Sequence, residues 1–283
     1  MEERRETERI WINKMSCKIS EQAKIGENFI CGENVVIEAN VIIGRNVEIG
    51  HNVVIRENVH IGDNCKILDG AILGKMPAKA SMSATTGAAR ELPPLEIGKA
   101  VTVGAGCVIY RGAKISDAAF FGDLATVRED VTIGEGTIIG RGATIENKVA
   151  IGKKTKIETN AYITAFSTVE DYCFIAPCVV FSNDNYLGRT EERKKHFKGP
   201  HIKKGARIGA GAVLLPGITV EEDGLVAAGS VVTKNVPARQ TVVGAPAKVW
   251  RPVPEEQLIE QQVYYEGGNN VLTQTPKIDF ISL

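Results

Sequence analysis

The sequence predicts an all-β solenoid built from short strands. An aliphatic residue recurs at every sixth position in three runs, which begin at Ile19, Ile97 and Ile202 and contain nine, 14 and six hexads. The fourth position of the hexad is Asn in seven successive repeats and is often Gly in later ones. A short fixed period signals a repeat architecture, and Asn and Gly enter the left-handed backbone region at the lowest cost. Each hexad is therefore expected to form a short strand that ends in a tight corner.

The hexad also predicts which side chains form the core. Its first position is aliphatic and its fifth is small or β-branched, so both are expected to point inward. Cys65, Cys107 and Cys173 occupy the fifth position and Cys31 the first, which makes them small core residues, whereas Cys178 falls outside this pattern. The sequence has no C-x-x-C pair, so neither a structural zinc site nor any other metal is expected.

Composition and charge exclude several classes of function. Lys plus Arg total 34 and Asp plus Glu total 34, which argues against a broad electrostatic surface for nucleic acid or an anionic membrane. No apolar run approaches the ~20 residues of a membrane span. The charged N-terminal residues 1–9 lack the apolar segment of a signal peptide. We therefore expect a cytoplasmic protein with no nucleic-acid or membrane partner.

The consecutive hexads resemble the hexapeptide-repeat acyltransferases over roughly residues 17–250. In that family three hexads form one triangular coil of a left-handed parallel β-helix, so the resemblance implies nine to ten coils here. We expect an N-terminal helical cap over residues 1–16, the β-helix over 17–250, and a C-terminal helix and tail over 251–283. The repeat is interrupted at 74–96 and 182–201. The second interruption is predicted to form one side of a ligand cleft. The first is predicted either to form another side of such a cleft or to be a disordered excursion.

Two late stretches, IGAGAVLLPGITV and VAAGSVVTKNVPARQTVVGAPAKVW, resemble the ending of acetyl-coenzyme A-dependent members of this family. The resemblance implies a homotrimer in which the pantetheine arm lies along the last coils between adjacent subunits. Small residues would let the arm approach the backbone, and basic residues would meet the phosphates. The alternative is that the Gly and Ala residues only satisfy corner geometry. The candidates for coenzyme binding are Gly209, Ala210, Ala227, Ala228, Lys234, Arg239, Pro246 and Lys248.

The motif VVFSNDNY holds Asn183 and Asp184 where sugar O-acetyltransferases of this superfamily usually carry a His. An Asn-Asp pair resembles the N-acetyltransferases that act on nucleotide-linked amino sugars. A neutral amine is already nucleophilic and needs less help from a base than a hydroxyl does. We expect Asn183 to orient the amine or to hold the thioester oxygen. The alternative is that the pair simply opens a turn.

Residues three hexads apart are expected to stack on successive coils. This register places Tyr110, Arg128, Glu146, Thr164 and Ser182 in one column that ends at the Asn-Asp motif. Glu146 would hold the substrate ammonium or accept its proton, and Arg128 would meet a phosphate; the alternative is a row of solvated side chains. The loop residues Tyr186 and Arg189 complete the predicted substrate site. The aromatic candidates for base stacking are Tyr110, Phe120, Tyr162 and Tyr186.

The stretches VREDVTIGEGTIIGRGATIEN and IAPCVVFSNDNYLGRTEE are most similar to 3-N-acetyltransferases of dTDP-3-amino-3,6-dideoxyhexoses. The resemblance implies direct attack of the amine on acetyl-coenzyme A. If a base acts, the candidates are His196, His201, Asp184 and Glu146. Two alternatives remain open: an acetyltransferase for UDP-amino sugars, or an O-acetyltransferase that uses His196 or His201. A hydratase with three metal-binding His is disfavoured, because His51 and His60 lie far from the loop. A solenoid without catalysis would leave the coenzyme-like ending unexplained.

Overall fold

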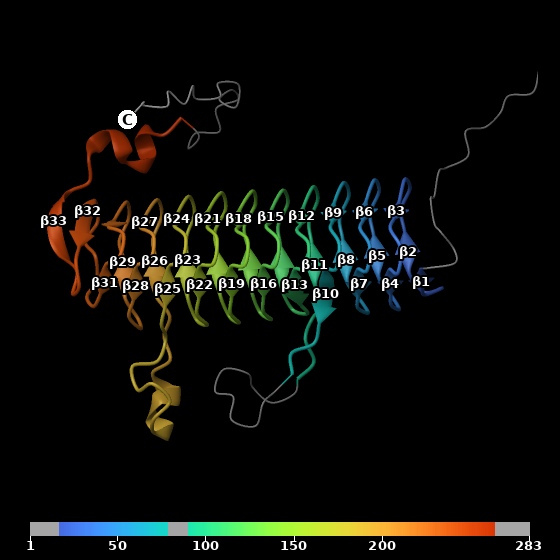
Figure 1. Ribbon diagram of the computed structural model, residues 1–283, viewed down its shortest axis with the longest axis horizontal. Coiled ribbons are helices and arrows are strands. Elements are labelled where there is room, and N and C mark those ends of the chain that lie inside the picture. Colours follow the sequence, from blue (N-terminus) through green and yellow to red (C-terminus); the bar gives the residue numbers. More distant parts are fainter. Residues whose placement is uncertain (1–16, 79–89, 264–283) are drawn as a thin grey trace, which may run out of the picture.

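A computed structural model describes residues 17–78 and 90–263 and shows a left-handed parallel β-helix (Figure 1). Its strands form three sheets, of 11, 10 and 12 strands, that run the length of the solenoid. Apart from the final antiparallel pair β32–β33, neighbouring strands in each sheet pair in parallel one coil apart, so that Val127 lies between Ile109 and Ile145. The all-β solenoid predicted from the hexads is confirmed.

The strands are short, and most contain two residues. Sheet 1 contains β1 (Lys18–Ile19), β4 (Val36–Ile37), β7 (Val54–Ile55), β10 (Ile72–Lys75), β13 (Val108–Tyr110), β16 (Thr126–Val127), β19 (Thr144–Ile145), β22 (Tyr162–Ile163), β25 (Val180–Phe181), β28 (Val213–Leu214) and β31 (Val231–Val232). Sheet 2 contains β2 (Lys24–Ile25), β5 (Ile42–Ile43), β8 (His60–Ile61), β11 (Glu96–Ile97), β14 (Lys114–Ile115), β17 (Thr132–Ile133), β20 (Ala150–Ile151), β23 (Thr168–Val169), β26 (His201–Ile202) and β29 (Thr219–Val220). Sheet 3 contains β3 (Ile30–Cys31), β6 (Glu48–Ile49), β9 (Lys66–Ile67), β12 (Thr102–Val103), β15 (Phe120–Phe121), β18 (Ile138–Ile139), β21 (Lys156–Ile157), β24 (Phe174–Ile175), β27 (Arg207–Ile208), β30 (Leu225–Val226), β32 (Gln240–Val243) and β33 (Lys248–Pro252).

The number of coils is slightly larger than the predicted nine to ten, because the sheets contain 10 to 12 strands. Leu73 in β10 and Phe181 in β25 fill the same inward position as the aliphatic residues of the hexads, at 0% and 1% exposure. Each of them lies six residues beyond the last counted hexad of its run. The strand β32 also extends sheet 3 beyond the final hexad.

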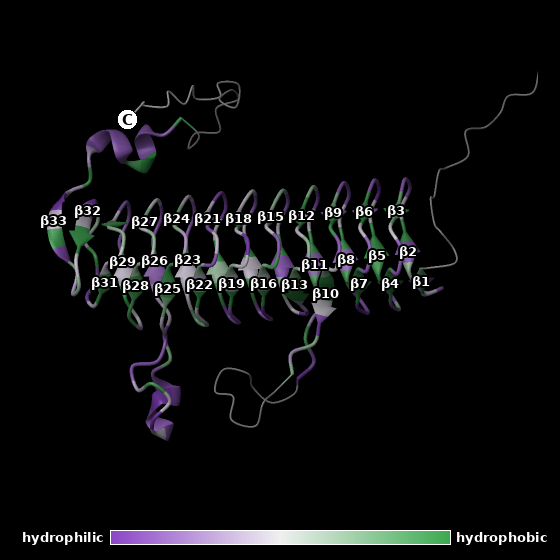
Figure 2. Cartoon of the chain, in the orientation of Figure 1, coloured by the Kyte–Doolittle hydropathy of each residue, from purple (hydrophilic) through white to green (hydrophobic). Residues whose placement is uncertain are grey.

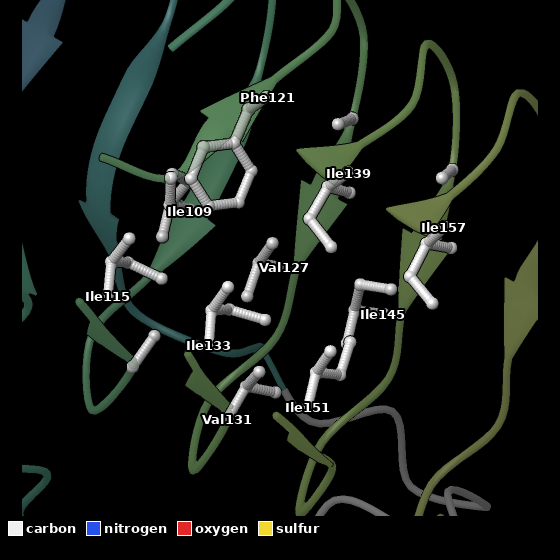
Figure 3. Close-up of a cluster of buried hydrophobic side chains, with 14 of the residues drawn as sticks. Ile109, Ile115, Phe121, Val127, Val131, Ile133, Ile139, Ile145, Ile151 and Ile157 are labelled. Atoms are coloured by element: carbon white, nitrogen blue, oxygen red, sulfur yellow. The ribbon is translucent and has the colours of Figure 1, made fainter. Parts of the chain in front are cut away.

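The core is a narrow aliphatic column inside the solenoid (Figure 3). Ile109, Val127, Ile139 and Ile145 come from different strands, and their side chains point into the interior. Phe121 is fully buried among them. The inward orientation predicted for the first and fifth positions is therefore confirmed, and the many Ile and Val residues suit such short, buried strands.

The corners explain the recurrent Asn. Asn28, Asn46 and Asn64 have φ between 54° and 60°, in the left-handed region that Asn tolerates better than most residues. Their side chains also stack: the amide of Asn28 donates to Asn46 at 2.9 Å, and that of Asn46 donates to Asn64 at 2.9 Å. One residue type thus provides the turn geometry and a hydrogen-bonded ladder between coils.

Most of the cysteines behave as the hexad predicts. Cys65, Cys107 and Cys173 are buried, and Cys178 is exposed. Burial raises the pKa of the Cys173 thiol to about 12. Cys31 is only half-buried, because it lies near the open N-terminal end of the described solenoid, and its sulfur is 3.5 Å from that of Cys17.

The C-terminal end of the solenoid is closed by an antiparallel hairpin and two short helices. β33 pairs with β32, and the 3-10 helices η2 (Glu255–Gln257) and η3 (Ile259–Gln261) follow. Asp223 accepts a hydrogen bond from the Ile259 backbone N–H at 3.0 Å. The terminal helix expected over 251–283 thus takes the form of two 3-10 turns as far as residue 263. The helix expected over 1–16 and the rest of the C-terminal tail lie outside the described residues.

Candidate functional site

Two excursions leave the solenoid from the same corner. The chain leaves after β10, which ends at Lys75, and again after β25, which ends at Phe181, and both strands belong to sheet 1. The two excursions project on the same side of the solenoid (Figure 1). Five strand spacings separate β10 from β25, which corresponds to roughly 24 Å. This stretch of the corner, between the two projections, holds the predicted polar column.

The structure brings the first members of this column into direct contact. The Arg128 guanidinium donates to the Glu146 carboxylate at 3.2 Å and to both oxygens of Glu129 at 2.9 and 3.0 Å. It also lies 5.2 Å from the centre of the Tyr110 ring, whose hydroxyl contacts Lys75 Nζ at 3.2 Å. The column therefore begins at the first excursion and contains a preorganised cluster of charges.

The neighbouring carboxylates keep Arg128 in its charged form. Burial by itself lowers the pKa of Arg128, but the hydrogen bonds and charge of Glu129 outweigh it, and the charge of Glu146 adds to the effect. The net result is a raised pKa, so the guanidinium stays charged. Arg128 and Glu129 are 17% and 6% exposed, whereas the Glu146 side chain is 20% exposed and lies farther along the column.

The later members of the column differ in exposure. Thr164 is buried, and its carbonyl accepts a hydrogen bond from Ser167 Oγ at 2.7 Å. Ser182 is half-buried at the end of β25. Tyr162, on the adjacent outward face of sheet 1, is 38% exposed. Burial raises the pKa of the Tyr162 hydroxyl, and the charge of Glu146 raises it further.

Asn183 and Asp184 organise the neck of the second excursion. Asn183 Nδ2 donates to the Ala165 carbonyl at 3.3 Å, and the Asn183 carbonyl accepts from the Lys198 backbone N–H at 3.2 Å. Asp184 accepts from the backbone N–H groups of Tyr186 at 2.8 Å and Gly188 at 2.9 Å. The Asn-Asp pair thus opens the turn, as the alternative interpretation expected, and Asn183 lies next to Ser182, the last residue of the column.

Asp184 is held in its ionised form. Burial opposes ionisation, but the backbone hydrogen bonds from Gly188 and Tyr186, together with Arg193 at 3.2 Å, lower the pKa of this carboxyl. A depressed pKa favours a structural anion over a proton acceptor. The catalytic role predicted for Asp184 stays a prediction, and its contacts favour a role in ordering the loop.

This pKa shift gives a pH-dependent expectation. Because the folded-state pKa of Asp184 is lowered, its stabilising contribution is present above the unfolded value of about 3.9 and disappears as the pH falls through the folded value. The amide resonances of Tyr186 and Gly188 should follow this titration in an NMR pH series, with a midpoint below the ordinary value for Asp. A midpoint at or above that value would contradict the loop-ordering role.

The excursion is mostly hydrophilic (Figure 2), and two of its rings stack on each other. It contains the 3-10 helix η1 (Glu191–Lys195). The Tyr186 ring stacks on His196 with their centres 5.8 Å apart, and His196 Nε2 lies 3.2 Å from Glu192. Arg189 is exposed. Tyr186 and His196 therefore belong to one small cluster within the loop, and their predicted roles in substrate binding and catalysis stay predictions.

The second loop histidine belongs to a different contact. His201 Nε2 lies 2.7 Å from Glu170 Oε1, and Glu170 Oε2 accepts the Lys204 backbone N–H at 3.1 Å. Glu170, Lys204 and Thr168 line a shallow groove of about 380 Å³ on sheet 2. Glu170 was not predicted from the sequence, because the second excursion shifts the register and separates this pair by 31 residues instead of one regular coil.

The small residues of the late coils lie at one corner, after sheet 3. A Cβ built on Gly209 would lie 2.5 Å from the Ala228 backbone nitrogen, so only glycine permits this approach between coils. Ala227 donates from its backbone N–H to Val242, which brings β32 alongside. The turn that contains Pro246 is joined to β31 through Ala247 and Val231. Gly209 therefore lies against Ala227 and Ala228 of the next coil, the turn with Pro246 is tied to β31, and Ala210 directly follows Gly209.

The predicted basic residues are more dispersed. Arg239 lies at the opposite end of β32 from the Pro246 turn and pairs with Glu260 at 2.8 Å. Lys248 begins β33 and is exposed, as is Lys234. The structure thus brings the small residues together but not the basic ones, and Arg239 holds the C-terminal segment.

Replacing Gly209 by alanine tests whether this glycine only satisfies the corner geometry or also binds the coenzyme. Gly209→Ala is expected to cost about 1–3 kcal/mol, since overpacked sites lose stability of this order, and to raise the KM for acetyl-coenzyme A roughly tenfold. Gly104→Ala is the matched control: it follows a strand of the same sheet, and its Cβ would lie 2.6 Å from the Asp123 nitrogen. Equal KM values for the two variants, measured by acetyl transfer, would refute the coenzyme role.

Membrane-spanning helices, metal sites and the two early histidines were also considered from the sequence, and the structure bears on each of them. In the described ranges, no helix is long and apolar enough to cross a bilayer, and no three His, Cys, Asp or Glu side chains gather as a metal site. His51 Nδ1 accepts the Glu33 backbone N–H at 2.9 Å, and His60 lies on sheet 2.

Comparison with known repeat families agrees with the fold. The family described as bacterial transferase hexapeptide (six repeats) matches residues 22–57, 41–75 and 112–147. The family described as hexapeptide repeat of succinyl-transferase matches residues 130–165 and 202–234. The matches fall on the early, middle and late parts of the solenoid.

The chain is also similar to individual acyltransferases. Serine acetyltransferase of Buchnera aphidicola subsp. Acyrthosiphon pisum (strain APS) is 42% identical over 76 residues, which are 27% of this chain and 28% of that protein. The matched region thus spans little more than a quarter of that relative. The Arabidopsis UDP-N-acetylglucosamine acyltransferase structure has a TM-score of 0.55 at 17% identity, covering 84% of this chain and 73% of that one.

A second solved structure, a UDP-N-acetylglucosamine acyltransferase from Bacteroides fragilis 9343, has a TM-score of 0.50 at 20% identity and covers 83% of this chain and 72% of that one. At these identities the two structures establish the shared fold. The repeat models match segments of this solenoid, so the chain is similar to hexapeptide-repeat transferases over those residues.

Proposed function

We propose that this chain is an acetyl-coenzyme A-dependent N-acetyltransferase that acts on a nucleotide-linked amino sugar, most specifically a dTDP-3-amino-3,6-dideoxyhexose. The observation that carries the proposal is the corner between the two projecting segments, where the Arg128–Glu146 pair lies in the column that ends at Ser182, next to Asn183. The similarity to hexapeptide transferases and to a serine acetyltransferase supports acyl transfer as the reaction.

Glu146 suits the recognition of an amine. Its carboxylate is oriented by Arg128 at 3.2 Å and remains 20% exposed. A carboxylate held in this way can accept a hydrogen bond from an ammonium or amine group. Because the Arg128 guanidinium is shared between Glu129 and Glu146, we assign it to positioning Glu146 in preference to the phosphate contact considered from the sequence.

Asn183 provides a neutral partner for the reacting groups. Its Nδ2 is anchored on the Ala165 carbonyl at 3.3 Å. An amide anchored through its nitrogen can still accept a hydrogen bond from the amine through its oxygen. This contact would orient the nitrogen lone pair toward the thioester, and correct orientation supplies much of the rate in such reactions.

The chemical step needs no dedicated base. The neutral amine attacks the thioester carbonyl carbon, and the tetrahedral intermediate collapses as the carbon–sulfur bond breaks. The surplus proton on nitrogen passes to the departing thiolate, directly or through water. His196 is stacked on Tyr186 and contacts Glu192, and His201 contacts Glu170, so both imidazoles already have partners away from Asn183.

The late coils are the proposed place of the coenzyme, with the pantetheine arm along Gly209, Ala227 and Ala228. We also propose a homotrimer, assembled in the cytoplasm. Its support is the outward column of sheet 1, which is uncharged from β4 to β31, whereas sheets 2 and 3 carry charged residues at equivalent places. The uncharged column consists of Val36, Val54, Ile72, Val108, Thr126, Thr144, Tyr162, Val180, Val213 and Val231.

The proposal is tested by incubating the protein with acetyl-coenzyme A and a panel of acceptors. The panel contains dTDP-3-amino-3,6-dideoxyhexoses, UDP-amino sugars and their hydroxy counterparts, and the products are read by mass spectrometry. We expect N-acetylation of a thymidine-linked amino sugar with release of free thiol. Transfer to the hydroxy sugars, or no transfer to any amino sugar, would overturn the proposal.

One observation favours a second candidate, a sugar O-acetyltransferase. The 2.7 Å contact between His201 and Glu170 is the kind of carboxylate-oriented imidazole that activates hydroxyls. His201→Ala distinguishes the two candidates: acetyl transfer to an amine should change less than tenfold. A loss of several orders of magnitude would assign the reaction to His201 as the base.

A further inference from the structure

A second groove lies on the early coils, away from the Asn183 corner. It has a volume of about 680 Å³, within the range of roughly 300–1,000 Å³ that is usual for small-molecule sites. The first strands of sheet 2 form the floor of the groove, and residues 91–94 together with Arg111 form a wall beside this floor. Six strand spacings of sheet 2 separate β8 in the groove from β26 beside the second excursion, or roughly 29 Å.

The floor of the groove is a regular column of sheet 2. Lys24, Ile42 and His60 are aligned on adjacent strands β2, β5 and β8. Ile42 is 42% exposed and lies between a cation and an imidazole. Beside this column, the Asn40 side chain donates to Asn58 at 3.2 Å. The floor therefore offers an apolar centre flanked by amide, imidazole and ammonium groups.

The wall beside this floor is fixed in place. Arg111 Nε donates to the Leu92 carbonyl at 2.9 Å, and its NH1 group donates to the Glu57 carbonyl at 3.2 Å. Leu92 is 2% exposed, and its Cδ2 atom lies 3.4 Å from the point where a Cβ on Gly112 would sit. Because this wall is anchored by a buried leucine and an arginine, the groove is a preformed feature.

The lining favours a neutral, hydroxyl-rich ligand. Arg111 is committed to two carbonyls and lies 3.9 Å from the Glu57 carboxylate. The remaining charges, Lys24 and Glu91, are opposite in sign, which disfavours a polyphosphate. Amide side chains both donate and accept hydrogen bonds, as paired hydroxyls require, and the Ile42 and proline surfaces suit the apolar face of a sugar ring. We propose that this groove binds a neutral saccharide, separately from the acetyl-acceptor site.

The test fills the groove and follows binding directly. Ligand-observed saturation-transfer NMR is recorded with neutral oligosaccharides (cellobiose, chitobiose and maltotriose) on the wild-type chain and on Ile42→Trp. The matched control is Thr132→Trp, which adds the same side chain to the same outward column of sheet 2 outside the groove. We expect saturation transfer to at least one saccharide in wild type and control, and roughly tenfold weaker binding in Ile42→Trp.

Three results would overturn the proposal. They are the absence of an NMR saturation-transfer signal for every saccharide, saccharide binding by Ile42→Trp that equals the wild type, or stronger binding of UDP than of any saccharide. The rate of acetyl transfer should be equal in the two Trp variants. Because saccharide binding is measured directly by NMR, this test remains valid even if the protein does not acetylate an amino sugar. A selective loss of acetyl transfer in Ile42→Trp would contradict a separate site, because it would merge the groove with the acceptor site. If Ile42→Trp does not fold, His60→Ala must weaken saccharide binding instead.

Discussion

Arg128→Met is expected to destabilise the protein by about 3–5 kcal/mol, since removal of one partner from a buried ion pair leaves an uncompensated charge. Glu129 is 6% exposed, and its two oxygens accept the Arg128 guanidinium at 2.9 and 3.0 Å. Loss of the guanidinium would leave this carboxylate buried and would also release Glu146. Chemical denaturation measures the first effect, and the KM for the amino-sugar acceptor measures the second.

A double substitution provides the control for this prediction. Arg128→Met combined with Glu129→Gln removes both buried charges and should recover much of the stability, because a neutral side chain costs less to bury. Its acceptor KM should stay high, since Glu146 still lacks its partner. The assigned roles of this cluster are wrong if Arg128→Met is as stable as the wild type, or if the double variant restores the acceptor KM.

Phe121→Ala is expected to destabilise the protein by about 3–5 kcal/mol, as buried Phe to Ala changes usually do. The Phe121 ring is fully buried and lies among Ile109, Ile139 and neighbouring aliphatic residues (Figure 3). In a solenoid each coil is supported only by its neighbours, so the cavity weakens the stacking on both sides. Thermal or denaturant unfolding measures the loss.

The adjacent residue provides the matched control. Phe120 belongs to the same strand, β15, but points outward and is 46% exposed. Phe120→Ala should therefore cost less than about 1 kcal/mol in the isolated chain, as most surface substitutions do. Similar losses for the two variants would contradict the assignment of inward and outward positions on which the fold rests.

The periodicity predicted the fold well because each rule acts within one hexad. The aliphatic first position, the small fifth position and the Asn or Gly corner are local requirements, and Asn28 and Asn46 show the expected left-handed φ. The coil count was less accurate at the interruptions, since Leu73 and Phe181 are core residues at the ends of broken runs. After β33, residues 255–257 and 259–261 form 3-10 turns that contact Asp223 and Arg239, which are distant in the sequence.

The candidate site was predictable only where the register is unbroken. Arg128 and Glu146 are one coil apart, and their contact follows from the repeat. Glu129 was missed, because its burial depends on the shape of the corner and on Arg128 beside it. The His201–Glu170 contact was missed because the second excursion intervenes between the two residues.

The most direct test of the proposed acceptor site compares two glutamates at the second position of their hexads. Glu146→Gln should lower kcat/KM for the amino-sugar acceptor roughly 100-fold, because Glu146 is placed in the column that ends at Ser182, next to Asn183. Glu158→Gln, which follows β21 on sheet 3, should leave kcat/KM within about twofold of the wild-type value. Equal kcat/KM values for the two variants would contradict the placement of the amine at this corner.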